Sequence, residues 1–336
     1  MAQKMTEVGG VPRFYATYGT ATSGPAAVTL TTPNGFKPTY IRLHDGTATS
    51  PNIYEWFEGM VAGSYLKTLG AHADSDKITY SATDGFTVST GSVLLGTGVL
   101  AASVVYKVAM FMAGDGGMVG GVPLFYSTYG ASAGSEAAVT LTTPKGFYPD
   151  WIRVVNDRAS ATPIIYEWHK GMTNPSAIST AQATGARAGN ASTTNGFTVA
   201  SGSIILGTDV QINSGEYCVF AGRFSQIGNA DVGGTPITYA ASGTAGATTV
   251  TLAPPDSFDP DWVYCVVAPN AAAVTPTTEW ILGYADPAAA LTTGSTGTVT
   301  LETANGINPG AGSIVFGTAC ITNGAAYTVY SARYSK

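Results

Sequence analysis

Charged residues are scarce in this sequence of 336 residues. Asp, Glu, Lys and Arg make up 11% of the chain, against roughly 25% in an average globular protein. The formal net charge is -6, and Lys and Arg form no cluster. The positive surface that attracts nucleic acid or an anionic membrane is therefore missing. We expect neither of these polyanions as a partner.

Cysteine and histidine are also rare. The three cysteines, Cys218, Cys265 and Cys320, have irregular spacing and form no CxxC motif, which argues against a disulfide framework or a zinc knuckle. We predict buried free thiols, because an unpaired cysteine packs as a small hydrophobic residue.

The histidines give no clear metal site. His44, His72 and His169 are the only three in the chain. Asp74 and Asp76 lie close to His72 in the sequence and allow a metal site of imidazole and carboxylate, but a solvated acidic loop is the preferred interpretation. We therefore predict no metal and no cofactor.

Long hydrophobic runs are missing as well. The first ten residues, MAQKMTEVGG, contain no apolar core of a signal peptide. The most apolar run, 99–112, carries Lys107 in its middle and is shorter than the roughly 18 residues of a membrane helix. We expect this run to be a strand.

Small and β-favouring residues are abundant. Hydrophobic residues make up 45% of the chain, and there are 42 glycines among many Thr, Ser and Ala. This composition is typical of short strands that are joined by tight turns. It predicts an all-β protein with a large core.

A motif of Glu followed by Trp occurs three times, at intervals of 112 residues. The copies are Tyr54-Glu55-Trp56, Tyr166-Glu167-Trp168 and Thr278-Glu279-Trp280. Other landmarks keep the same phase, among them VTL at Val28, Val139 and Val250 and the runs GFTVSTGSVLLGT, GFTVASGSIILGT and GINPGAGSIVFGT. An interval of this length matches a whole small domain.

The repeat divides the chain into a tail and three units. The tail is 1–8, and we name the units repeat 1 (9–117), repeat 2 (118–230) and repeat 3 (231–336). Each has seven or eight strand-like runs between turn residues, which predicts three tandem antiparallel β-sandwich domains of immunoglobulin-like or jelly-roll-like type. The glycine-rich links are short and favour close packing of the units.

The glutamate of each motif needs a partner if it is fixed beside an aromatic core. Arg42 precedes Glu55 and Arg153 precedes Glu167 by a distance that suits a cross-strand pair in a hairpin. Repeat 3 has a tyrosine in place of this arginine, so we expect Arg333 in its last strand to supply the cation for Glu279. Since neighbours in a strand point to opposite faces, a tryptophan in the core directs the glutamate outward or toward a neighbouring strand. We predict a structural framework made of Glu55, Trp56, Arg42, Glu167, Trp168, Arg153, Glu279, Trp280 and Arg333.

The catalytic alternatives are weaker. A glycosidase needs a second carboxylate near the first; Glu58 could serve in repeat 1, but Lys170 and Leu282 take its place in the other repeats. The letters G-x-S-x-G at 130–134 match a nucleophile elbow, but the other two repeats carry different turns there. We expect no enzyme and no catalytic residues. Sugar recognition by exposed aromatic residues remains an alternative.

The runs GFKPTYIRL…YEWFEGM and GFYPDWIRVVND…YEWHKGM, followed by GFTVASGSIILGT, resemble small β-domains in virion structural proteins of tailed bacteriophages, including head decoration (cement) proteins. The resemblance covers all three repeats and is weakest in the third. It implies a non-enzymatic protein that is assembled in the host cytoplasm and is located on the virion, where it binds the major capsid protein and stabilises the head.

Three fused units could also act as a pseudo-trimer at a local threefold axis of a capsid. The expected contacts are the tail 1–8 and the turns 44–52, 156–163 and 268–276, which differ most between the repeats. The alternative is an adhesin of the tail or fibre that binds glycans.

Overall fold

The structure is a computed structural model of the whole chain. It describes residues 11–23, 26–47, 50–69, 78–114, 118–119, 122–132, 137–156, 163–180, 187–210, 215–224, 237–246, 249–255, 258–268, 276–284, 288–294 and 299–334. The tail 1–8, His72, Asp74 and Asp76 lie outside these residues, as do 48–49, 157–162 and 269–275 of the three turns that are expected to make contacts. The rest of the turn 44–52 belongs to the ends of two strands.

Repeat 1 forms one antiparallel sheet of eight strands, in the order β1-β8-β3-β4-β5-β6-β7-β2. The strands are β1 (Phe14–Thr20), β2 (Val28–Thr31), β3 (Tyr40–Thr47), β4 (Ser50–Phe57), β5 (Ser64–Leu69), β6 (Ile78–Ser89), β7 (Ser92–Leu95) and β8 (Val105–Phe111).

Repeat 2 forms a second eight-stranded sheet with the equivalent order, β11-β18-β13-β14-β15-β16-β17-β12. Its strands are β11 (Phe125–Ala131), β12 (Val139–Thr142), β13 (Trp151–Asn156), β14 (Ile164–His169), β15 (Ser176–Thr180), β16 (Arg187–Ala200), β17 (Ser203–Leu206) and β18 (Glu216–Gly222). A small hairpin precedes it, made of β9 (Met118–Val119) and β10 (Val122–Pro123).

Repeat 3 divides into two sheets, with the orders β19-β27-β21-β22-β23-β24 and β20-β26-β25. The strands are β19 (Thr238–Thr244), β20 (Val250–Leu252), β21 (Trp262–Val267), β22 (Thr277–Ile281), β23 (Ala290–Thr293), β24 (Val299–Glu302), β25 (Ile307–Gly310), β26 (Ser313–Phe316) and β27 (Ala326–Ala332).

The all-β prediction is confirmed. Apart from strands, the described residues contain two single 3-10 turns, η1 (Thr97–Val99) and η2 (Thr208–Val210), and no α-helix. The apolar run 99–112 contains β8, as expected from its counterparts β18 and β27. The three cysteines are buried thiols that form no disulfide bond, as predicted.

The central strand of each repeat is buried on both faces. On β13, Ile152 and Val154 point into the core of repeat 2, whereas Trp151 and Val155 join a different core cluster. This alternation follows from the two-residue period of a strand. A strand that is covered on both sides needs the nearly continuous apolar run that WIRVV provides.

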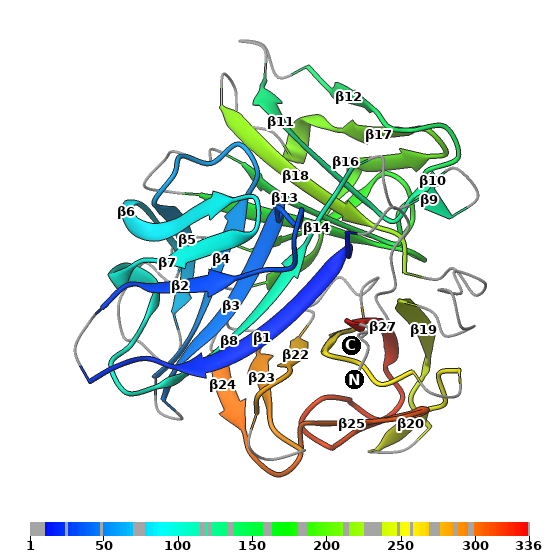
Figure 1. Cartoon of the computed structure of the whole chain (residues 1–336). Coiled ribbons are helices and arrows are strands. Elements are labelled where there is room, and N and C mark those ends of the chain that lie inside the picture. The colour runs from blue at the N-terminus through cyan, green and yellow to red at the C-terminus, as the bar shows by residue number, and fades with distance from the viewer. Residues whose placement is uncertain are drawn as a thin grey trace.

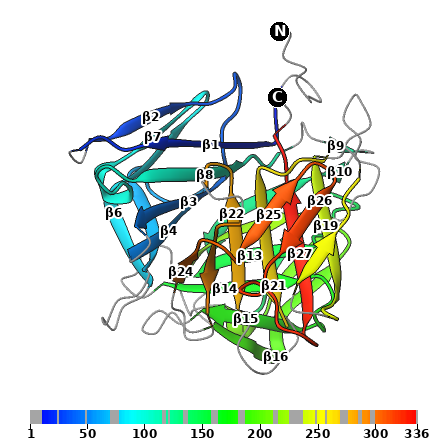
Figure 2. The same cartoon turned by 90° about the horizontal axis from the view of Figure 1, so that it is seen from below.

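The second face of these strands is covered by the other repeats. Figures 1 and 2 show the three groups of strands side by side around a common centre, not in an extended row. At this centre one apolar cluster combines large side chains of all three repeats, among them Phe111, Phe125, Trp151, Phe220, Trp262 and Tyr330.

One close approach recurs in each repeat. A glycine in the first strand lies under a tyrosine of the last strand, so that a Cβ atom on Gly19, Gly130 or Gly243 would lie 2.3, 2.5 or 2.7 Å from the hydroxyl oxygen of that tyrosine. Packing between neighbouring strands therefore requires a glycine at the second position of these Tyr-Gly and Ser-Gly pairs.

A buried ring of glutamates at the centre of the chain

The three repeated glutamates lie opposite equivalent positions of the preceding strand. The strand register pairs Glu55 with Arg42, Glu167 with Arg153, and Glu279 with Tyr264. The hairpin pairing predicted for the first two is therefore present. All three glutamates are almost completely buried, with exposures of 1%, 0% and 2%.

The predicted direction of the glutamates requires a correction. Trp56, Trp168 and Trp280 pack in the cores of their own repeats, and the glutamates point to the opposite face, as the alternation demands. That face is neither exposed to solvent nor covered by a neighbouring strand alone. The other two repeats cover it.

Glu55 binds two arginines and one tyrosine. Its Oε1 accepts hydrogen bonds from Tyr40 Oη (2.5 Å), Arg42 Nη1 (2.9 Å) and Arg153 Nε (2.7 Å). Its Oε2 accepts a fourth from Arg153 Nη2, at 2.6 Å. Arg153 belongs to repeat 2, so this forked pair joins two repeats with the geometry in which guanidinium binds carboxylate best.

Glu167 has an equivalent arrangement in which two of the partner residues differ in type. Its Oε1 lies 2.7 Å from Arg153 Nη1 in its own repeat and accepts a hydrogen bond from Trp151 Nε1 at 3.2 Å. From repeat 3 the donor is Tyr264 Oη, at 3.0 Å. A neutral hydroxyl thus stands where repeats 1 and 2 place a guanidinium.

Glu279 closes the ring between repeats 3 and 1. Its Oε1 accepts from Trp262 Nε1 at 2.6 Å, and its Oε2 accepts from Arg42 Nε at 2.5 Å. His44 of repeat 1 adds a further contact, with Nε2 2.8 Å from the same oxygen.

The contacts form one cycle. Each glutamate accepts from an aromatic residue at the start of the central strand of its own repeat: Tyr40, Trp151 or Trp262. Each also accepts from the next repeat, at the position occupied by Arg42, Arg153 or Tyr264. We call the nine residues Glu55, Glu167, Glu279, Arg42, Arg153, Tyr264, Tyr40, Trp151 and Trp262 the glutamate ring.

The expectation for Arg333 is wrong. The cations beside Glu279 come from repeat 1 instead, as Arg42 and His44. Arg333 follows the end of β27, and its backbone N–H donates to Ile237 O. Its counterpart Arg223 donates from Nη1 to the carbonyls of Val122 and Pro123. The arginine at this position therefore binds the segment that precedes the first long strand of its own repeat.

Burial and ion pairing act against each other on these groups. Burial raises the pKa of Glu279, but Arg42 and His44 outweigh it and lower the pKa to about 2. Burial likewise raises the pKa of Glu55, and Arg153 with Arg42 brings it below the ordinary value. Both carboxyl groups are therefore charged at neutral pH.

The ring contains more acidic than basic side chains. Three glutamates face two guanidiniums, and burial lowers the pKa of His44, which favours its neutral form. The neutral donors of the ring compensate, because a buried carboxylate needs hydrogen bonds where it lacks a cation.

The sequence reasoning missed the donors Tyr40, Trp151, Trp262, Tyr264 and His44. The first three stand two residues before the arginine position in every repeat, so their common phase was visible. Nothing in the sequence distinguished an aromatic residue that only packs from one that also donates to a carboxylate in its own repeat.

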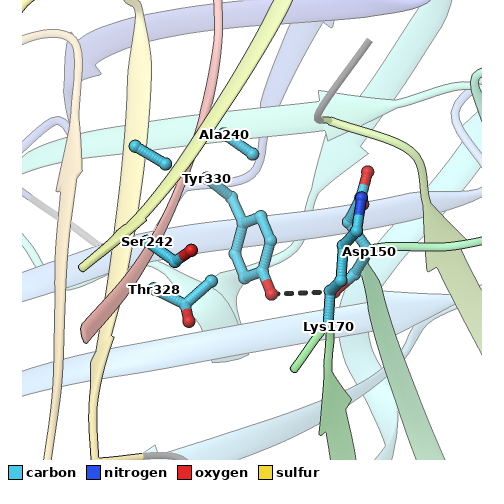
Figure 3. A pocket seen from close by; sticks show the side chains of 7 residues that line it. Asp150, Lys170, Ala240, Ser242, Thr328 and Tyr330 are labelled. Carbon is cyan, nitrogen blue, oxygen red and sulfur yellow. Dashed lines mark hydrogen bonds and ion pairs between the residues drawn. The ribbon is translucent and has the colours of Figure 1, made fainter. Parts of the chain in front are cut away.

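Two clefts lie at equivalent places between repeats. One of about 310 Å³ lies between repeats 1 and 2 and includes Glu58 and Tyr126. The other, of about 130 Å³, lies between repeats 2 and 3, where Lys170 pairs with Asp150 and Tyr330 donates to the Asp150 carbonyl (Figure 3). Glu55 lines neither cleft, so it does not form a catalytic pair with Glu58 there.

The structure adds no support for the alternative metal site or for the nucleophile elbow. Among the described residues, no group of three His, Cys, Asp or Glu side chains is placed to hold a metal ion. The G-x-S-x-G letters begin inside β11, in which Gly130 is opposite Tyr217, and the last two letters, 133–134, lie outside the described residues. A search of the described residues also finds no helix with the length and apolar character that a membrane crossing requires.

Two comparisons with known proteins find no match. No protein family model matches the chain, and no curated protein matches it.

Proposed function

We propose that the chain is a non-enzymatic structural protein of a bacteriophage virion, a decoration protein that binds the major capsid protein on the outer surface of the head. In this proposal the repeats are three homologous β-sandwich domains around a pseudo-threefold axis. One chain then takes the place of a homotrimer at a local threefold axis of the shell.

The glutamate ring is the observation that carries this proposal. Each carboxylate is bound by its own repeat and by the next one, so the contacts run from repeat 1 to 2, from 2 to 3 and from 3 back to 1. Closed contacts of this kind are typical of a cyclic trimer. They make the three repeats one unit with three similar outer faces.

The use of the polar residues also supports a structural role. The acidic and basic side chains of the repeat motif, Glu55, Glu167, Glu279, Arg42 and Arg153, are buried in the interior, away from any substrate in solution. A protein of this design stabilises a shell by binding the assembled state alone, which raises the stability of that state by mass action.

The test uses heads from which this chain has been removed. Purified protein should bind such heads in a saturable manner in cosedimentation, and should raise the temperature at which they release DNA. A cryo-EM map should place the chain on the outside of the head with its three repeats around a local threefold axis. Density on the tail, or three repeats in an extended row, would refute the proposal.

An adhesin that binds glycans is the second candidate, and one observation favours it. Tyr18 and Tyr129 occupy equivalent positions in β1 and β11 and are 55% and 54% exposed. Exposed aromatic rings can stack on sugars. This candidate predicts a signal of the isolated protein on a glycan array that is lost in the double variant Tyr18→Ala and Tyr129→Ala, with no effect of the chain on the heat resistance of heads.

A further inference from the structure

The cleft between repeats 1 and 2 differs in charge from its counterpart between repeats 2 and 3. The first is lined by Glu58, which directly follows β4, and the second by Lys170, which directly follows β14. Repeat 3 has Leu282 at this position. The backbone is equivalent in all three, because the N–H of each residue donates to the carbonyl of the residue before the central strand, at 2.8, 2.8 and 2.9 Å. The difference therefore lies in the side chains.

The cleft between repeats 2 and 3 contains an ion pair of the chain itself. Lys170 and Asp150 both line it (Figure 3), and Lys170 Nζ lies 2.9 Å from Asp150 Oδ1. The carboxylate is buried, whereas the lysine side chain is half exposed. The remaining space is about 130 Å³. An ammonium group that reaches a carboxylate is thus already accommodated at one of these places.

The cleft between repeats 1 and 2 lacks such a pair. Thr39 takes the place of Asp150 there and keeps its backbone contact: Thr39 Oγ1 accepts from Ala113 N at 2.9 Å, as Asp150 Oδ2 accepts from Phe224 N at 2.6 Å. Glu58 is the only charged side chain among the described residues that line this cleft. In the part of the chain that the structure describes, no cation pairs with it. The space beside this carboxylate is larger, about 310 Å³.

The rest of the lining suits a long side chain with a polar end. Its larger apolar residues are Pro123, Phe125, Tyr126 and Pro144. Ser127 adds a hydroxyl whose oxygen is buried and has no hydrogen-bond partner among the described residues, and the other two repeats have alanine at this position. A hydroxyl oxygen can accept a hydrogen bond from a cationic group. The methylene stem of lysine or arginine packs on apolar surface while its charged end reaches polar partners.

We propose that this cleft binds a basic side chain of the partner protein, and that Glu58 and the Ser127 hydroxyl hold its charged end. The identity of this partner as the major capsid protein rests on the proposed function. An external arginine or lysine then supplies between repeats 1 and 2 the cation that Lys170 supplies between repeats 2 and 3. Because repeats 2 and 3 have no carboxylate at this position, each chain makes the contact once and not three times.

The position of Glu58 fits this role. The residue is partly exposed, so a basic group reaches it from solvent without unfolding of the chain. The walls of the cleft also keep part of the solvent away, and an ion pair in such a place is screened by salt less than one on an open surface.

A capped amino acid tests the cleft without any partner. N-acetylarginine methylamide is added to the isolated protein at low salt, and the backbone amide signals of Glu58 and Ser127 are followed by NMR. We expect shifts that saturate. The citrulline analogue, which has a similar shape and no charge, should cause none, and arginine should cause none in Glu58→Gln. No shift in the wild-type protein, or equal shifts with citrulline, would overturn the proposal.

Heads from which the chain has been removed test the use of the cleft. Glu58→Gln should bind them about tenfold more weakly than the wild-type protein, as expected for the loss of one charged contact at an interface. Asp259→Asn removes an exposed carboxylate of repeat 3 and should bind like the wild type. Equal binding of the wild type and Glu58→Gln would overturn the proposal and leave the decoration function intact. Wild-type protein that binds no heads but responds to arginine would refute the decoration function and support the site.

A double variant drawn from the chain itself closes the site. Thr39→Asp with Glu58→Lys copies the pair of Asp150 and Lys170, and the new aspartate can accept from Ala113 N as Asp150 does from its counterpart. The variant should fold, lose the response to arginine and bind heads no better than Glu58→Gln. A folded double variant that still responds to arginine would contradict the proposed site.

Discussion

Arg153 of repeat 2 donates two hydrogen bonds to Glu55 of repeat 1, from Nε to Oε1 at 2.7 Å and from Nη2 to Oε2 at 2.6 Å. The third nitrogen of the same guanidinium, Nη1, lies 2.7 Å from Glu167 of its own repeat. One side chain therefore serves two carboxylates and two repeats. The repeated glutamate joins repeats and does not merely complete a hairpin.

Arg153→Met should be strongly destabilising. It leaves the buried carboxylates of Glu55 and Glu167 short of their shared cation, and breaking such a pair costs about 3–5 kcal/mol. Urea unfolding at neutral pH measures the change in the free energy of unfolding. Lys145→Met is the control, because Lys145 is exposed and surface substitutions usually stay within about 0.5 kcal/mol. Equal stability of the two variants would contradict the role of the ring.

Tyr264→Phe tests the neutral member of the ring. It removes the hydroxyl that donates to Glu167 and keeps the ring that stacks on Trp262. We expect a loss of about 1–3 kcal/mol, because a buried acceptor loses its partner. Thermal and urea unfolding measure the change. Tyr18→Phe is the matched control on an exposed tyrosine and should leave the free energy of unfolding nearly unchanged.

Acid should weaken the protein through Glu279. Its pKa is about 2 in the folded chain against 4.5 for an unperturbed carboxyl group, so the unfolded state takes up the proton first. Stability from this group is complete above about pH 4.5 and is lost as the pH falls toward about 2, by about 3 kcal/mol in all. Urea midpoints measured across this range should fall less steeply in Glu279→Gln. An unchanged slope would show that Glu279 is not held by Arg42 and His44.

Gly283→Ala should weaken the contact between repeats 3 and 1. Gly283 has a φ of 107°, and a Cβ there would lie 2.4 Å from Tyr18 Cβ of repeat 1. Gly171→Ala is the matched control, since its φ is 94° and nothing lies within 4 Å of its Cβ position. Both variants carry the backbone strain, and Gly283→Ala should cost about 1–3 kcal/mol more, the usual cost of overpacking. Equal losses of stability for the two variants in thermal unfolding would contradict a close contact between repeats 3 and 1 at Gly283.

The local pairing could be predicted because it depends on distances along the chain. A hairpin places residues at a fixed sequence separation opposite each other, which is why Arg42 and Glu55 were recognised as partners. The same reasoning failed for Glu279. Its own hairpin offers Tyr264 in place of arginine, and its cation, Arg42, is 237 residues away, where no local rule applies.

The sequence by itself determined the all-β class, the threefold repeat and the side of each strand on which a residue lies, because composition, the interval of 112 residues and the two-residue period of a strand are properties of the chain alone. Only the tertiary structure decided that the glutamate face is interior. A strand pattern states which residues share a face, but what covers that face is set by packing between distant segments. Here the other two repeats cover it, and they turn Glu55, Glu167 and Glu279 into the members of one ring.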